Sequence, residues 1–290
     1  MERQGEWLLI RLSREMAKEL VDVDVYLTSK LGIPTEYVFR MNKQQDIEWI
    51  GDRLRLRFFP MRELGFTPEW MPIEVLFEDD FCLVVNKPAG IPVHPTVSNG
   101  RGSLANAVAA YYEASAQLCA VRHIHRLDEW TSGPVLFAKN AYAQHQLDQD
   151  MRDRMIKRVY VAIVQGLPLK KKGCIRAAIG KDRHVNGKRR VSPTGDDAVT
   201  HYEVIETYKE ASLLRLILET GRTHQIRVHM SHIGHPILGD EMYGGSSERI
   251  QHQALHGESL GFRHPFDRHE VSVQAELPEH MKMLIELLKV

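Results

Sequence analysis

Cysteine is scarce in this chain of 290 residues, which holds only three. An odd number of cysteines at wide spacing gives no sign of a disulfide framework. Cys82 and Cys119 lie in apolar runs, where a free cysteine behaves as a small buried hydrophobic residue. We therefore expect unpaired thiols and a reducing compartment, the cytoplasm.

Long apolar runs are missing as well. No stretch approaches the ~20 apolar residues that a membrane-spanning helix needs, and residues 1–6 contain no apolar core of a secretion signal. We expect neither a membrane span nor secretion. Repeats and low-complexity segments are also absent, and a content of 43% hydrophobic and 26% charged residues is ordinary for a globular protein.

Net charge is the third absence, since 38 basic residues balance 38 acidic ones. A nucleic-acid-binding protein usually carries a basic excess, but here the charges are unevenly distributed. The N-terminal part is acidic, whereas only Asp182 opposes a basic span in the middle of the chain. Such a span is either a solvated face or a surface for a polyanion. It comprises Lys170, Lys171, Lys172, Arg176, Lys181, Arg183, Lys188, Arg189 and Arg190.

The first 70 residues differ in pattern from the rest. Two prolines, Pro68 and Pro72, interrupt regular structure after them. The length allows a main domain with an appendage, so we predict an appendage at residues 1–70 and a main domain at residues 71–290. In the appendage, Thr35 is placed to cap a helix. The predicted elements there are helices over residues 25–31 and 35–41 and a strand over residues 53–58.

The main domain is predicted to be α+β, with a mixed, mainly antiparallel central sheet flanked by helices, because its strands and helices do not follow a regular βαβ repeat. In one helix we expect Ile226, Met230 and Ile233 to be buried. The last helix is expected to pack through Met283, Leu284, Leu287 and Leu288. The predicted helices cover residues 103–118, 140–155, 223–233 and 279–289, and the predicted strands cover residues 76–87 as a pair, 159–165, 199–207 and 212–219.

A candidate catalytic acid is Asp128, in the run HRLDEWTSG from His125 to Gly133. Apolar, strand-like runs precede and follow this segment. A carboxylate where a strand meets a turn is held on a rigid support, which is a normal way to present a catalytic group. The alternative for a single aspartate at a turn is a cap or turn residue.

Two further segments carry candidate residues. Tyr160 lies in RVYVAIVQG, which begins at Arg158, and a tyrosine on a strand is by default a core residue. Arg227 lies in GRTHQIRVH, which begins at Gly221, beside the expected buried face of a helix. A guanidinium there can hold a carboxylate in bidentate fashion and keep it ionised. A surface ion pair is the alternative for a single arginine.

The histidines near Arg227 suggest a metal site as a rival interpretation. Their spacing does not follow a zinc signature such as HExxH, and on a helix His224 and His235 do not converge with His229. We expect no metal. The residues of this alternative are His224, His229, His232, His235 and Asp240.

The three segments resemble the signatures of RluA-type RNA pseudouridine synthases. Further segments resemble the family in the same order, from about residue 75 to residue 266. The sequence departs from the family at Pro134, where leucine is usual, and at Glu129 and Trp130; Trp130 either stacks on RNA or fills core space. The appendage resembles, faintly, the alpha-L RNA-binding module. The further segments are residues 81–95, 197–204, 253–256 and 260–265.

The resemblance implies a pseudouridine synthase fold and conversion of uridine to pseudouridine in structured RNA, without metal or cofactor. It implies that Asp128 is the catalytic carboxylate, that Tyr160 stacks on the base and takes part in proton transfer, and that Arg227 orients Asp128. Arg126 would fill the gap left by a flipped nucleotide. The expected RNA-binding residues are Arg126, Lys170, Lys171, Lys172, Arg183, Lys188, Arg189, Arg190, Arg222 and His224.

The RNA itself is left open by the sequence. The extra N-terminal region favours ribosomal RNA, and transfer RNA is the alternative. A non-catalytic RNA-binding protein that keeps the fold is the other class to be considered. The resemblance also implies a monomer.

Overall fold

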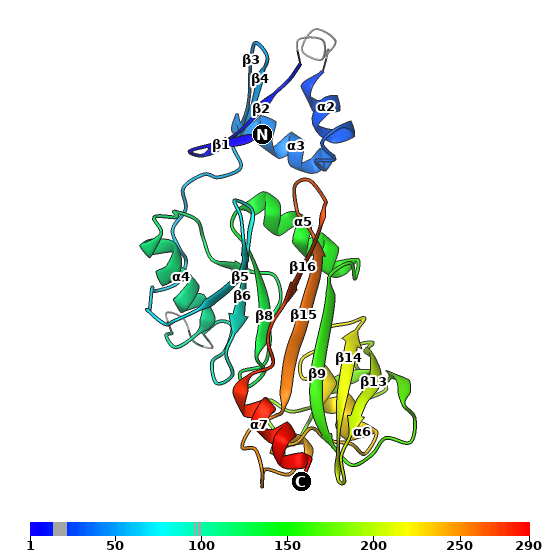
Figure 1. Cartoon of the computed structure of the whole chain (residues 1–290). Helices are drawn as coiled ribbons and strands as arrows, with labels where there is room; N and C mark the ends of the chain where they lie inside the picture. The colour runs from blue at the N-terminus through cyan, green and yellow to red at the C-terminus, as the bar shows by residue number, and fades with distance from the viewer. Residues whose placement is uncertain (14–21, 96, 98–99) are drawn as a thin grey trace.

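Antiparallel sheets dominate the structure (Figure 1). It is a computed structural model, and it describes residues 1–13, 22–95, 97 and 100–290. The largest sheet has the order β10 (Lys172–Arg176), β13 (Val199–Thr207), β14 (Ala211–Leu218), β9 (Lys157–Gln165), β15 (Leu255–Arg263) and β16 (Glu270–Gln274). A second sheet has the order β5 (Glu74–Glu78), β6 (Cys82–Lys87), β8 (Gly133–Ala138) and β7 (Arg122–His123). With the helices around them, these sheets confirm the predicted α+β class.

The two sheets meet at a tight seam between β8 and β15. Ser132 bridges to His256 in parallel fashion, and the amide of Gly257 donates to the carbonyl of Ser132 at 2.8 Å. A Cβ on Gly133 would lie 2.6 Å from the carbonyl oxygen of Gly257, and Gly133 has φ 125. Only glycine fits both the backbone conformation and the close approach. The end of the run that contains Asp128 is thereby fixed to the large sheet.

Helices cover the sheets largely where the sequence predicts them. Ser103 forms a capping box with Asn106 at the start of α4, and the side chain of Asn140 caps α5. Both helices end earlier than predicted. The helices of this part of the chain are α4 (Leu104–Ala114), α5 (Ala141–Arg152), α6 (Gln225–His232) and α7 (Glu279–Leu288), with a short 3-10 turn η1 (Glu241–Tyr243).

The buried face of α7 differs from the prediction. Met281, Leu284 and Leu288 are buried, whereas Met283 is 60% exposed and Leu287 is 59% exposed. The helix carries two overlapping apolar stripes at helical spacing, and the sequence does not say which of them meets the sheets.

The N-terminal residues form a separate sheet that packs on α5 (Figure 1). Phe58 stacks on Tyr142 of α5 with ring centroids 4.7 Å apart, and Tyr37 meets the same ring edge-on at 5.0 Å. Pro34, not Thr35, caps the second helix, which runs on to Gln44, so the predicted cap is wrong. The elements are β1 (Glu2–Gln4), β2 (Trp7–Arg11), β4 (Arg53–Leu56) and β3 (Ile47–Ile50) in that order, with α2 (Val23–Ser29) and α3 (Thr35–Gln44).

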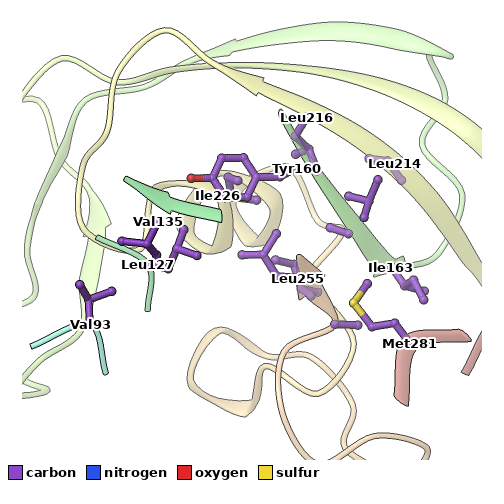
Figure 2. Close-up of a cluster of buried hydrophobic side chains, with 14 of the residues drawn as sticks. Val93, Leu127, Val135, Tyr160, Ile163, Leu214, Leu216, Ile226, Leu255 and Met281 are labelled. Atoms are coloured by element: carbon purple, nitrogen blue, oxygen red, sulfur yellow. The ribbon is translucent and has the colours of Figure 1, made fainter. Parts of the chain in front are cut away.

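The main core includes Leu127, which directly precedes Asp128, and Figure 2 shows part of it. Leu127, Tyr160, Ile226 and Leu255 gather there from a loop, β9, α6 and β15, and each is 7% exposed or less. Burying an apolar side chain of this size contributes about 1.5–3 kcal/mol. Four segments distant in sequence are therefore held together by the core that supports Asp128.

The structure can be compared with the expectations for the cysteines and for membrane-spanning helices. The three cysteines are free, although only Cys82 is buried. Cys119 is half-buried and Cys174 is exposed. Among the helices of the described residues, none combines the length and apolarity that crossing a membrane requires.

We expect a pH-dependent contribution to stability from His264, whose Nε2 lies 2.8 Å from Asp79. Burial opposes the imidazolium, but Asp79 and Asp267 outweigh it and raise the pKa of His264 above 6.5. The stabilisation is therefore present below pH ~6.5 and is lost as the pH rises through the raised pKa. The variant His264→Gln should lose about 2 kcal/mol at pH 6, and less as the pH rises.

Urea unfolding of both proteins at pH 6 to 9 measures this difference. The variant His184→Gln, at an exposed position, should match the wild type throughout. A difference between His264→Gln and wild type that does not change with pH would contradict the assignment.

Candidate active site

Asp128 lies in the loop between β7 and β8. The amide of Thr131 donates to the carbonyl of Asp128 at 3.0 Å, which closes a turn, and Leu127 anchors the loop in the core. The side chain of Asp128 is 23% exposed, so its carboxylate reaches solvent from a fixed backbone. This is the rigid presentation that the sequence predicts.

Two clefts meet at Asp128. One, of about 440 Å³, is lined by all three predicted catalytic residues, Asp128, Tyr160 and Arg227, and by Arg126, Arg222 and His224 of the predicted RNA-binding set. The other, of about 910 Å³, shares Asp128, Arg126, His224 and Arg227 and opens past Trp130.

Arg227 is buried and contacts two carboxylates. Its Nε and Nη2 donate to the two oxygens of Asp240 at 2.7 and 2.8 Å, and its Nη1 donates to Oδ2 of Asp128 at 3.2 Å. The bidentate partner is therefore Asp240, and Asp128 receives a single bond, where the sequence suggested a bidentate hold on the active carboxylate. From the sequence, Asp240 was considered only as a possible metal ligand.

A chain of hydrogen bonds runs from β12 (Arg189–Val191) to His224, which lies next to Asp128. The hydroxyl of Tyr243 accepts from the amide of Arg189 at 2.9 Å and lies 2.9 Å from Nδ1 of His224. We assign the hydroxyl hydrogen of Tyr243 to its bond with Nδ1 of His224, so that Nδ1 is the acceptor. The other ring nitrogen, Nε2, then carries the proton and faces Asp128 at 3.9 Å. Burial lowers the pKa of His224, against the charge of Asp128, so the ring is neutral near neutral pH.

Helix α6 is fixed to β13 by polar side chains one turn apart. Gln225 accepts from Thr220 and donates to Thr200, and His229 contacts Thr200 at 2.8 Å and the carbonyl of Ala177 at 2.9 Å. Since residues four apart share a helix face, Gln225 and His229 hold one side of the helix while Arg227 is presented on another.

Lys87 is a buried residue of the site that the sequence reasoning passed over. Its ammonium donates to the carbonyls of Pro88, Ile91 and Glu129 at 2.7 to 2.9 Å, tying the loop after β6 to the residue that follows Asp128. Burial lowers its pKa to about 7, although Asp128 and Glu129 oppose the shift. The sequence signal was a lysine directly before a proline at the end of a buried strand.

Tyr160 is buried on β9 and lines the smaller cleft. Figure 2 shows its ring among Leu127, Ile226 and Leu255. Burial raises the pKa of its hydroxyl, which has no hydrogen-bond partner among the residues described. The ring therefore belongs to the core while its hydroxyl is free for a substrate.

The predicted RNA-binding residues separate into two places. Lys188 lies 5.4 Å above the ring of Tyr243, and Arg189 is tied to the same residue, so β12 borders the site. Lys172 lies on β10 opposite Glu203 of β13 and forms an ion pair with it at 2.8 Å. Glu203 is four residues from Val199, the end of β13 that lies near the cleft. The other members near β10 and β12 are exposed: Lys170, Lys171, Arg183 and Arg190.

Of the two roles considered for Trp130, the structure argues against filling of the core. It is 36% exposed, so it does not fill the core, and it stacks on His252 with the rings nearly parallel. Its ring also lies 3.1 Å from the position that a Cβ on Gly90 would take. The indole therefore forms a wall of the larger cleft.

Three of the four histidines of the metal alternative, His224, His229 and His235, have other partners. Both ring nitrogens of His229 are engaged by Thr200 and Ala177, and His235 contacts the carbonyl of Gln165. Within the residues that the structure describes, the side chains close enough to share an ion are elsewhere, around His264. Asp240 is occupied by Arg227.

Known proteins with similar sequence or structure agree on one class. The family described as RNA pseudouridylate synthase matches residues 81–232. The uncharacterized RNA pseudouridine synthase YhcT of Bacillus subtilis is 43% identical over 236 residues, which cover 81% of this chain and 78% of that protein. The ribosomal large subunit pseudouridine synthase D of Zymomonas mobilis is 36% identical over 300 residues, which cover 98% of this chain and 92% of that protein.

A solved structure leads to the same class. Human RNA pseudouridylate synthase domain containing 4 superposes with a TM-score of 0.61 at 25% identity, covering 74% of this chain and 92% of that one. Fold and similarity together define an enzyme that isomerises uridine in RNA. The chain belongs to the RNA pseudouridine synthases of the RluA type.

We expect the Arg227–Asp240 pair to be required for stability. Asp240→Ala leaves a guanidinium that is 8% exposed without its bidentate partner, which costs about 3–5 kcal/mol in comparable buried pairs. Urea unfolding measures the loss.

The matched control is Glu258→Ala. Glu258 also holds an arginine, Arg215, by two bonds of 2.8 and 2.9 Å, but at the surface. Its loss should cost about 0–1 kcal/mol. Equal losses in the two variants would show that burial of the Arg227 pair is not what matters.

Proposed function

We propose that this enzyme converts uridine to pseudouridine in ribosomal RNA and that Asp128 is its catalytic carboxylate. The observation that supports it best is the position of Asp128, where two clefts meet, in contact with Arg227 and in the same cleft as the buried Tyr160. In the reaction the bond from C1′ of the ribose to N1 of uracil breaks. C5 then bonds to C1′, loses its proton, and N1 takes one up.

Each residue of the cleft has a proposed part in this reaction. Asp128 acts as the unprotonated group next to the ribose and base. Arg227 orients Asp128 through its third donor, and Tyr160 stacks on the base and offers its hydroxyl for proton transfer. Arg126 is exposed at the lip of both clefts, which suits a side chain that takes the place of a flipped nucleotide.

Ribosomal RNA is favoured because several relatives carry the name ribosomal large subunit pseudouridine synthase D. Transfer RNA is the second candidate. We further propose that residues 1–70 form an appendage with a small direct part in RNA binding, since Arg55 and Arg57 of its sheet region are already paired with Glu48 and Glu6. The enzyme is proposed to act in the cytoplasm as a monomer.

The test of Asp128 is tritium release from RNA labelled at C5 of uridine, purified from cells that lack this enzyme. Asp128→Asn should lower the rate by more than about 10³-fold, as for other essential catalytic groups, while RNA binding and the free energy of unfolding stay near those of the wild type. Ribosomal and transfer RNA, used separately, identify the substrate class.

Asp153→Asn, an exposed aspartate after α5, is the control and should release tritium normally. Turnover by Asp128→Asn at the wild-type rate would refute the role of Asp128. Release from transfer RNA alone would refute the choice of ribosomal RNA and keep the activity.

We expect RNA affinity to fall with salt, and Arg222 to contribute to that dependence. Arg222 is exposed at the rim of the smaller cleft, so Arg222→Gln should reduce the slope of log K against log salt by about 1. Filter binding between 50 and 300 mM salt measures the slope. Lys172→Gln is the comparison, because the ammonium of Lys172 is already paired with Glu203. This variant should change the salt slope less than Arg222→Gln does.

A further inference from the structure

A buried cation of the smaller cleft has no partner. Arg158 is 9% exposed and lines the cleft together with Asp128 and Tyr160. Its Nε is fully buried without a hydrogen bond, and in the described part of the chain its guanidinium forms neither an ion pair nor a hydrogen bond. A desolvated charge without compensation is unfavourable, so this side chain is placed for something that the protein does not itself supply.

The surroundings hold Arg158 in the cleft. It lies two residues before Tyr160 on β9, so both side chains project from the same face of the sheet. A Cβ on Gly221 would lie 2.6 Å from Nη1 of Arg158, so the guanidinium passes over the bare backbone of Gly221.

Charge in the cleft favours an anion. Its lining contains Arg126, Arg158, Arg222 and Arg227, opposed by a single carboxylate, Asp128. Arg227 is already compensated by Asp240, and Arg126 and Arg222 are exposed to water. Arg158 is thus the one desolvated and uncompensated cation among the lining residues.

We propose that Arg158 is a substrate-binding residue whose guanidinium donates hydrogen bonds to a negatively charged oxygen of the target nucleotide. The proposal rests on the proposed function of this cleft. Two oxygens have the required chemistry. One belongs to the phosphate of the nucleotide, and the other is a carbonyl oxygen of uracil, which gains negative charge when the C1′–N1 bond breaks and its electron pair stays on the ring.

The test compares Arg158→Met, Arg158→Lys and Gly221→Ala with the wild type in tritium release from labelled ribosomal and transfer RNA. Arg158→Met removes the charge and keeps much of the volume. Gly221→Ala keeps the charge but displaces the guanidinium. We expect Arg158→Met to lower kcat/KM by about 10²-fold, Gly221→Ala to lower it to a smaller extent, and Arg158→Lys to restore part of the loss.

The kinetic split distinguishes the two oxygens. A phosphate contact raises KM and reduces the salt slope of RNA binding by about 1. A contact to the uracil carbonyl lowers kcat and leaves KM and RNA affinity unchanged. Lys157→Gln is the matched control, since Lys157 is the exposed neighbour on β9, and it should keep both constants.

The proposal is overturned if folded Arg158→Met turns over at the wild-type rate. If that variant does not fold, wild-type turnover by Gly221→Ala overturns it instead. The outcome for the Arg158 variants does not depend on whether Asp128 is the catalytic residue or on which RNA class is the substrate. Activity of Asp128→Asn or release from transfer RNA alone would change the proposed function, while the comparison of the Arg158 variants with wild type would still decide this inference.

Discussion

The geometry of the cleft depends on the buried ion pair between Arg227 and Asp240. The planar guanidinium donates to Asp240 through Nε and Nη2, and its remaining nitrogen, Nη1, donates to Asp128. A lysine ammonium has no fixed fork and would not relate two carboxylates in this way. Asp240 therefore sets the direction in which Arg227 acts, and Arg227 in turn fixes the position of Asp128, the proposed catalytic carboxylate.

The same carboxylate is held from two other sides. The glycine seam between Gly133 and Gly257 fixes the end of its loop to the large sheet, and Lys87 fixes the residue after Asp128, Glu129, to the loop after β6. A catalytic group must be held within a fraction of an ångström, which requires support from rigid elements and not from the loop alone. Here the support is backbone packing on one side and an ammonium bonded to three carbonyls on the other.

Much of this arrangement could be predicted from the sequence, and the failures have physical reasons. Strand 199–207 was predicted at its observed bounds because β-branched and aromatic residues are frequent in it. The buried face of α7 was not, because two apolar stripes overlap. The cluster of Asp128, Tyr160 and Arg227 was predicted as motifs. The partner of Arg227 and the isolation of Arg158 are properties of three-dimensional distance and have no local sequence signal.

The packing of Phe58 and Tyr37 on Tyr142 has a consequence for how the N-terminal region can vary. A module joined by a flexible tether can be lost or exchanged without harm to its neighbour. Here the hydrophobic cluster continues from the N-terminal sheet through Tyr142 to Phe266, so removal of the N-terminal part uncovers apolar surface beside α5. Such surfaces favour aggregation. A change of this region therefore has to be accompanied by a change in the face that it covers.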